Sequence, residues 1–417
     1  MLPGKDHRLQ RAGRENVGRR RFLASAAAFS FTIVKPSSIR GSQANSRIKL
    51  GMIGCGMRGK WIAPLFVKHG GFQFVGAADY FQDRADRFGE MFDIDSKRCY
   101  ATLSGYKRLL DLRPDAVAIE SPPYFHPEQA AAAVDAGIHV NLAKPVAVDV
   151  PGCRMVEEAG RRAASKNLVF LADFQTRVNT FYQEAVQRVH RGDIGPIGLG
   201  EACFNGGDVW NSWNPVEHFL EESPNDPEAR LKAWGLDRAL SGDIIVEQSI
   251  HTIDVATWIL DAAPVSATGS GSRKHYQHGD AWDTFAVLYR FPNAVDVLFN
   301  AKQFGKGYSD IGCRMYGMAG TIDTHYGGEV AIRGNNPYPG GNTGKLYPEG
   351  TSANIALFHQ CITASQVANK TVAPSVRSNL ASILGRVAAV KRRDVTWSEM
   401  MNANEKLESN VVKQLKA

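Results

Sequence analysis

The spacing of apolar positions divides the chain into two regions. From residue 47 to about residue 173, short apolar runs alternate with amphipathic or alanine-rich stretches. The runs are expected to be strands and the stretches helices. Strands alternating with helices predict a doubly wound parallel sheet, the Rossmann arrangement. The expected strands are 47–53, 72–78, 116–120, 139–142 and 168–171, and the expected helices include 60–69 and 127–136.

Beyond residue 173 the pattern is typical of a different sheet. A helix is expected over 181–191, and a glycine- and proline-rich loop over 334–350. Between them, apolar and polar residues alternate with a period of two, which predicts a mostly antiparallel, open-faced sheet in an α+β domain. The alternating segments are 284–291, 295–301, 312–316 and 321–324, and two closing helices are expected at 354–369 and 379–392.

The first 44 residues belong to neither pattern. Arg19 and Arg20 precede an apolar stretch, residues 22–34, and Ser42-Gln43-Ala44 resembles a small-x-small cleavage site. The stretch is shorter than the roughly 20 residues that span a bilayer. We interpret residues 1–44 as a twin-arginine signal peptide, with a basic disordered tail as the alternative. Export to the periplasm, or by the same route elsewhere, is the expectation.

Charge and cysteine content narrow the function. The chain has 49 basic and 42 acidic residues, of which the leader holds nine and two, so the remainder is formally neutral. A nucleic-acid partner would need a basic patch in the folded part and is not expected. The six cysteines have no tight spacing, which predicts neither a disulfide framework nor a zinc site. Length predicts two domains after the leader, 45–173 for the dinucleotide and 174–417 for substrate and oligomerisation.

A glycine-rich turn follows the first expected strand. Gly54-Cys55-Gly56-Met57-Arg58-Gly59 has the spacing with which a strand–turn–helix binds a pyrophosphate at the helix N-terminus. Asp79 follows Gly59 by twenty residues, where a carboxylate accepts hydrogen bonds from ribose hydroxyls. A 2′-phosphate would meet like charge there, which favours NAD over NADP, although Arg84 lies close in sequence. The alternative is a turn that binds nothing.

Two further strand ends carry candidate chemistry, because ligands of such sheets bind beyond the carboxyl ends of strands. One is the turn from Ser121 and Pro122 to His126, and the other is Ala143-Lys144-Pro145. Lys144 would point into the cleft and could help move a substrate proton. From spacing alone a solvated loop lysine is the more frequent case, and His126 is more often a cap or packing residue.

The stretch 241–260 is expected to form a helix in the second domain. Glu247, His251 and Asp254 recur at i, i+4 and i+7 and would share one face. A carboxylate beside an imidazole can tune proton transfer. A solvated polar face and a metal site of the same three side chains are the alternatives; no metal is expected. The aromatics upstream could stack on sugar rings or pack the domain: Trp210, Trp213, Phe219 and Trp234.

Together these motifs resemble the Gfo/Idh/MocA oxidoreductases, the glucose–fructose oxidoreductase and inositol dehydrogenase group, over residues 47–400. The resemblance implies that Lys144 and His251 handle the proton and that Glu247 supports them. Ala143 departs from the family's usual Glu-Lys-Pro, and Glu247 replaces an aspartate. The expected substrate contacts are Lys144, Arg177, Glu247 and His251 from the resemblance, and Trp234 from the aromatic residues that could stack on a sugar. The implied cofactor contacts are Gly54, Cys55, Gly56, Met57, Arg58, Gly59, Asp79, Ser121, Pro122, His126, Lys144 and Gln175.

These expectations describe an NAD(P)-dependent oxidoreductase that acts on a sugar, cyclitol or polyol by hydride transfer. One alternative is an NAD-assisted glycosidase or lyase that works through a transient 3-keto sugar. Another is a non-catalytic sugar or nucleotide sensor, which the departure at Ala143 leaves open. A twin-arginine substrate is exported folded, to a place without a free NAD pool, so we expect a tightly held nucleotide. The open sheet face predicts a homodimer or homotetramer. A membrane span is not expected.

Overall fold

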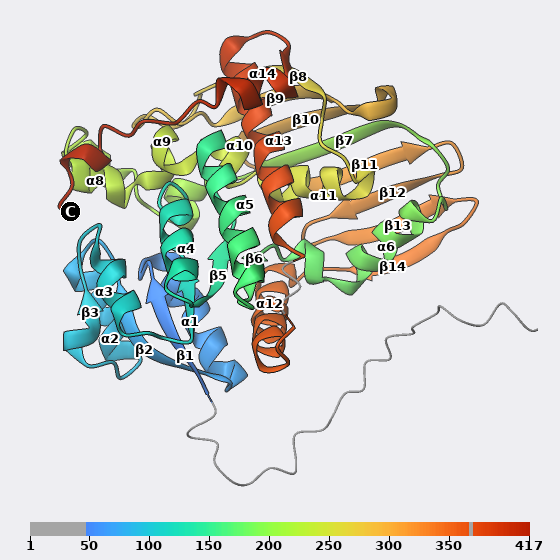
Figure 1. The fold of residues 1–417 in the computed structure, drawn as a ribbon. Coiled ribbons are helices and arrows are strands. Elements are labelled where there is room, and N and C mark those ends of the chain that lie inside the picture. Colours follow the sequence, from blue (N-terminus) through green and yellow to red (C-terminus); the bar gives the residue numbers. More distant parts are fainter. Residues whose placement is uncertain (1–46, 367–369) are drawn as a thin grey trace, which may run out of the picture. The chain divides into compact units, whose positions relative to one another are not determined.

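A computed structural model describes residues 47–366 and 370–417, which contain two β-sheets (Figure 1). The expected signal peptide, residues 1–44, lies outside the described residues. In the part of the chain that the structure describes, no helix is long and apolar enough to cross a membrane.

The first sheet has six parallel strands in the order β3-β2-β1-β4-β5-β6. Helices alternate with these strands along the chain, so the doubly wound arrangement expected from the sequence is confirmed. The strands are β1 Ile48–Ile53, β2 Phe72–Ala78, β3 Cys99–Tyr100, β4 Ala116–Ile119, β5 His139–Ala143 and β6 Phe170–Asp173. The helices are α1 Met57–His69, α2 Gln82–Met91, α3 Gly105–Asp111, α4 His126–Asp135 and α5 Val150–Ser165.

The second sheet has nine strands in the order β14-β13-β12-β11-β7-β10-β9-β8-β15. Among the pairings that the described residues make within this second sheet, only β7–β10 is parallel, so the mostly antiparallel sheet is confirmed. The strands are β7 Ile197–Gly206, β8 Ser266–Ser272, β9 Thr284–Arg290, β10 Asp296–Gln303, β11 Asp310–Gly317, β12 Gly320–His325, β13 Glu329–Gly334, β14 Tyr338–Asn342 and β15 Val395–Thr396.

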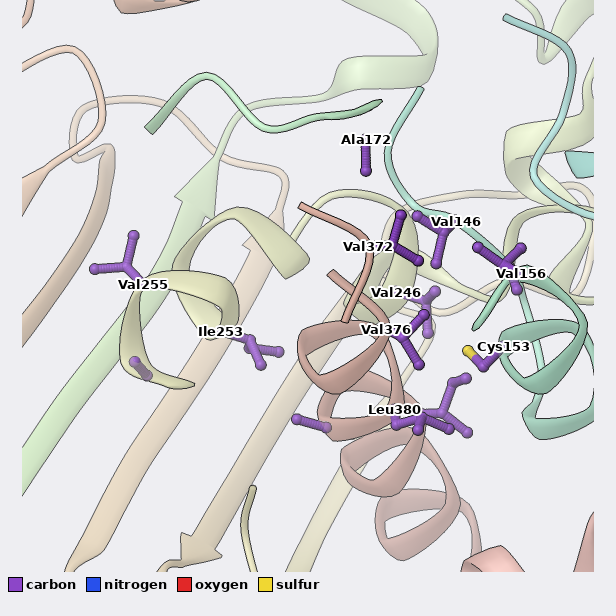
Figure 2. Close-up of a cluster of buried hydrophobic side chains, with 14 of the residues drawn as sticks. Val146, Cys153, Val156, Ala172, Val246, Ile253, Val255, Val372, Val376 and Leu380 are labelled. Atoms are coloured by element: carbon purple, nitrogen blue, oxygen red, sulfur yellow. The ribbon is translucent and has the colours of Figure 1, made fainter. Parts of the chain in front are cut away.

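Helix α13, Val372–Lys391, lies between elements of both halves of the chain. Figure 2 shows Val376 and Leu380 of α13 among side chains of α5 on one side and of α11, Ile250–Leu260, on the other. All of these side chains belong to one continuous buried cluster. Because dense packing resists deformation, this core fixes the strand ends of the first sheet against the second sheet. The other helices are α6 Thr180–His190, α7 His218–Glu222, α8 Pro227–Lys232, α9 Arg238–Ser241, α10 Ile244–Glu247, α12 Leu346–Thr363 and α14 Trp397–Ala403.

Two expectations about local structure are wrong. The stretch 334–350 is not a plain loop, because it contains β14 and the start of α12. The stretch 241–260 is not one helix, because α9 ends at Ser241 and two separate helices, α10 and α11, follow it. The amide of Ser249 donates to the carbonyl of Ile244, five residues back, which interrupts the α-helical hydrogen bonding at that point.

Candidate active site

A cavity of about 1190 Å³ lies at the carboxyl ends of the parallel strands. Its walls come from the ends of β1, β2, β4 and β5 and, opposite them, from β7, the segment 208–219, α8 and α11. Ordinary small-molecule pockets measure about 300–1,000 Å³. The cavity therefore has room for a large ligand, such as a dinucleotide together with a substrate.

The glycine turn forms one end of this cavity. Gly54 has a φ of 91°, and a Cβ there would lie 2.5 Å from the amide nitrogen of Ser121. A Cβ on Gly59 would lie 2.0 Å from the carbonyl oxygen of Gly54, so any side chain would push α1 away from the turn. A Cβ on Gly56 would meet only Arg84, at 3.7 Å. The N-terminus of α1 is thus open to the cavity and fits a phosphate group.

Asp79 lies beside this turn, as the sequence spacing predicts. Its Oδ2 accepts a hydrogen bond from the amide of Cys55 at 2.8 Å, and its Oδ1 accepts one from the amide of Phe81 at 3.0 Å. Arg84 stacks on the Phe81 ring at 4.6 Å and, like Asp79, lines the cavity. Burial raises the pKa of the Asp79 carboxyl. The carboxylate is held in place by the backbone and keeps lone pairs for ribose hydroxyls.

Lys144, Glu247 and His251 meet at the cavity wall although they come from three different elements. Lys144 follows β5, Glu247 ends α10, and His251 lies in the first turn of α11. The Nζ of Lys144 donates to the carbonyl oxygen of Glu247 at 2.5 Å and to its Oε1 at 3.1 Å. The side chains of this ion pair are only 15% and 8% exposed.

His251 is enclosed by rings and by positive charge. Its imidazole lies 4.9 Å from the ring of Tyr326 and 6.5 Å from that of Phe204, centroid to centroid. Burial, and then the charges of Lys144 and Arg58, hold the pKa of His251 well below its usual range. The imidazole is therefore neutral at pH 7 and can accept a proton.

Two atoms of this group are left without a partner. Among the described residues, Nδ1 of His251 and Oε2 of Glu247 are buried polar atoms with no hydrogen-bond partner. Buried polar groups are nearly always paired in folded proteins. Unpaired atoms at a cavity wall are the expected condition of a site whose ligand supplies the missing bonds.

A second charged cluster in this cavity was not expected from the sequence. Arg58 Nε donates to Glu120 Oε2 at 3.2 Å, Arg58 Nη2 to Asp173 Oδ2 at 2.6 Å, and Arg58 Nη1 to the Tyr347 hydroxyl at 2.6 Å. Its guanidinium also lies 4.9 Å from the ring of Trp61. Burial raises the pKa of Glu120 to about 7, against the opposing effect of Arg58. The sequence feature that could have indicated this cluster is an acidic residue at the end of each of two apolar strands, Glu120 and Asp173.

The structure corrects two predicted contacts, His126 and Arg177. His126 is 1% exposed, and its Nδ1 and Nε2 lie 2.8 Å from the carbonyl oxygen of Pro145 and 2.7 Å from that of Ser121. Both ring nitrogens therefore face the backbone, and the ring ties the two strand-end loops together. Arg177 forms a bidentate ion pair with Asp254 instead of facing the cavity. Asp254 also accepts from Ser378, so it does not share a functional face with His251.

The other predicted residues fall into two groups. Cys55 and Gly59 are buried under the turn and act through the backbone, Cys55 as the donor to Asp79. The remaining ones line the cavity; they are Gly54, Gly56, Met57, Arg58, Asp79, Ser121, Pro122, Lys144, Gln175, Trp234, Glu247 and His251. Trp234 packs edge-on against Trp210, with ring centroids 5.3 Å apart, so it contributes both to the wall and to the local core.

The donor sets do not form a metal centre in the described ranges, where no group of three or more His, Cys, Asp or Glu residues could hold an ion. The glycine turn, the Asp79 carboxylate and the size of the cavity fit a dinucleotide. Lys144, His251 and Glu247 lie in the same cavity wall and can carry out proton chemistry. The fold and the site thus define a dinucleotide-dependent oxidoreductase of the Rossmann class.

Comparison with known proteins identifies the family. The model described as the oxidoreductase family with an NAD-binding Rossmann fold matches residues 48–174, and that of the GFO/IDH/MocA C-terminal domain matches residues 182–323. The chain belongs to the Gfo/Idh/MocA oxidoreductase family, and its first sheet forms an NAD-binding domain.

Similar proteins include dehydrogenases of cyclitols and sugars. Inositol 2-dehydrogenase 3 of Saccharopolyspora erythraea is 27% identical over 284 residues, 66% of this chain and 72% of that protein. D-glucoside 3-dehydrogenase of Escherichia coli is 21% identical over 285 residues, 64% of this chain and 70% of that protein. The structure of scyllo-inositol dehydrogenase from Lactobacillus casei, with NAD(H) and scyllo-inositol, has a TM-score of 0.66 and 20% identity, covering 84% of this chain and 99% of that one.

Proposed function

We propose that the protein oxidises a carbinol carbon of a sugar, cyclitol or related polyol, with NAD as the hydride acceptor. The main support for the proposal is that Lys144, Glu247 and His251 all line the cavity. Two buried atoms of this group, Nδ1 of His251 and Oε2 of Glu247, have no hydrogen-bond partner among the described residues. A polyol offers adjacent hydroxyl groups, which both donate and accept hydrogen bonds. Such a substrate can satisfy the imidazole nitrogen and the carboxylate oxygen together.

The residues divide the work of one oxidation. The Lys144 ammonium, which Glu247 holds at two oxygens, donates to the reacting hydroxyl and stabilises negative charge as it develops on that oxygen. The neutral imidazole of His251 accepts the hydroxyl proton. When bound, the oxidised nicotinamide supplies the acceptor for the hydride that leaves the same carbon. Enclosure of substrate and cofactor in one cavity supplies the proximity that hydride transfer needs.

The test is a substrate panel with purified protein and NAD. Cyclitols, aldoses and glycosides are added one at a time, and formation of reduced cofactor is followed by absorbance. We expect reduction with at least one class, and its loss in Lys144→Ala protein that still binds NAD. Release of an aglycone without net reduced cofactor would instead favour an NAD-assisted glycosidase or lyase. Binding of NAD with neither reaction would contradict the proposal.

We also propose that residues 1–44 direct twin-arginine export and that the folded protein carries its nucleotide tightly. The paired Arg19 and Arg20 before an apolar stretch support the first proposal. Exposure of Leu199 and Leu298, 40% and 49%, on the second sheet supports assembly into a homodimer or homotetramer. Mass spectrometry of the native protein would report leader cleavage, bound nucleotide and subunit number together. A full-length, nucleotide-free monomer would contradict all three proposals.

A further inference from the structure

Glu120 lines the same cavity as the glycine turn and Lys144. It follows β4, the strand that pairs with β1 on one side and with β5 on the other. In the register Ile119 lies opposite Leu142, which places Glu120 level with Ala143 and one residue from Lys144. Ala143, beside it on β5, carries only a methyl group.

The two carboxyl oxygens of Glu120 have different surroundings. Oε2 accepts the hydrogen bond from Nε of Arg58, while Oε1 is buried and has no partner among the described residues. Asp173 provides a comparison, because it shares Arg58 but has both oxygens bonded. Its Oδ2 accepts from Arg58 and its Oδ1 accepts from Asn354 at 2.6 Å. Glu120 is among the residues that line the cavity, but its side chain is 0% exposed, so the free Oε1 lies behind the cavity surface.

Charged and titratable groups face Glu120 from every neighbouring element. They are Arg58 from α1, Asp173 from β6, Lys144 after β5 and Tyr347 from α12. Burial raises the pKa of Glu120 to about 7; the charge on Asp173 acts in the same direction, and Arg58 and Lys144 act against it. An acid–base group is most effective when its pKa lies close to the working pH.

We propose that Glu120 is a further catalytic residue, whose free Oε1 takes up the proton released by substrate oxidation. This inference rests on the proposed dehydrogenase function. The O–H bond of the substrate breaks and its electron pair becomes part of the new C=O bond, while the hydride passes from carbon to NAD. The proton passes first to His251. Lys144 gives one of its own protons to Glu120, whose carboxylate becomes a carboxylic acid, and the lone pair freed on Nζ then takes the proton from His251. Lys144 begins and ends the step as an ammonium paired with Glu247.

The experiment compares four full-length proteins: wild type, Glu120→Gln, Glu120→Asp and the matched control Asp173→Asn. Single-turnover reduction of NAD is measured from pH 5.5 to pH 9, using a substrate that the wild type oxidises. Infrared difference spectra of the same proteins without cofactor follow titration of buried carboxyl groups. Thermal unfolding reports whether each variant is folded.

The wild-type rate should rise with pH through about 7, as Glu120 becomes able to accept a proton. Glu120→Gln should slow the reaction by about 100-fold and abolish this rise, and Glu120→Asp should recover part of both. Asp173→Asn should keep the rise, because it perturbs the same Arg58 without removing the free oxygen. The rise should move to lower pH, because the Asp173 charge helps to raise the pKa of Glu120. The infrared band of the Glu120 carboxyl should disappear in Glu120→Gln and persist in Asp173→Asn.

An unchanged pH profile in folded Glu120→Gln would overturn the inference, and so would equal losses in Glu120→Gln and Asp173→Asn. Both results would assign Glu120 a purely structural role in holding Arg58. If the wild type oxidises no substrate, the proposed function fails. The infrared titration still tests Glu120 in that case, because a group that does not titrate near neutral pH cannot be the proton acceptor.

Discussion

Replacement of Lys144 by methionine removes one charge from a nearly buried ion pair. Lys144 donates to the carbonyl oxygen and to Oε1 of Glu247 at 2.5 and 3.1 Å, and the two side chains are 15% and 8% exposed. Removal of one partner of a buried pair costs about 3–5 kcal/mol, because the other charge stays buried without compensation. Lys144→Met should therefore lower the free energy of unfolding by an amount in that range.

Loss of catalysis should exceed what this destabilisation explains. A positioned acid–base group contributes about 10²–10⁴-fold to a rate, and the hydride-transfer rate of the folded variant should fall by that factor. Denaturant unfolding and single-turnover NAD reduction measure the two effects separately. The double variant Lys144→Met/Glu247→Gln should regain much of the stability, since it removes the orphaned charge, but none of the activity.

Lys391→Met is the matched control, since Lys391 pairs with Glu399 at 3.3 Å while both side chains are 35% exposed. This exposed pair should contribute at most about 1 kcal/mol. Near-normal hydride transfer in folded Lys144→Met would refute the assignment of Lys144 to the reaction. A stability loss no larger than that of Lys391→Met would refute the treatment of the Lys144 pair as buried.

Three further predictions concern the glycine turn, cofactor choice and pH. Gly54→Ala should abolish NAD binding in a fluorescence titration, because its Cβ would lie 2.5 Å from a backbone atom. Gly70 is also at positive φ but has open space around it, so Gly70→Ala should cost only about 1–2 kcal/mol of stability. Asp79→Ser should reduce the preference for NAD over NADP by about tenfold in competition binding; an unchanged ratio would exclude Asp79 from ribose recognition. The hydrogen bond to Asp323 raises the pKa of His325 to about 9, so the pair's contribution to stability is complete below about pH 6.5 and is lost as pH rises through 9. Unfolding of His325→Gln should show a deficit of about 1.5 kcal/mol at pH 6 that disappears by pH 10.

Elements whose structure depends on local sequence spacing could be predicted from the sequence. The strand–turn–helix around Gly54 and the acid at Asp79 were predicted, since their spacing reflects a local structure that the chain forms over about 30 residues. Strand β8, SATGSGS, was missed because its small and polar residues carry no alternation; it exists because β9 and β15 pair with it. Its conformation is set by neighbours distant in sequence, which is typical of strands.

The active site was only partly predictable for the same reason. Lys144 and His251 were selected by motif, but the break between α10 and α11 that presents Glu247 depends on tertiary packing. Arg177 was expected at the substrate because it follows a strand end, yet it pairs with Asp254, 77 residues away. From the sequence, Glu120 is only the end of an expected strand and Asp173 only the expected domain boundary, since nothing local to them indicates that Arg58 bridges both.

The most direct test of the central claim is isotope transfer from substrate to cofactor. The polyol that reduces NAD in the panel is prepared with deuterium on the carbinol carbon, and the nucleotide is recovered after one turnover for mass spectrometry. Direct hydride transfer predicts one deuterium in the reduced nicotinamide and a slower single turnover than with the unlabelled substrate. Product formed without label in the nucleotide would contradict the claim that this cavity carries out an NAD-dependent oxidation.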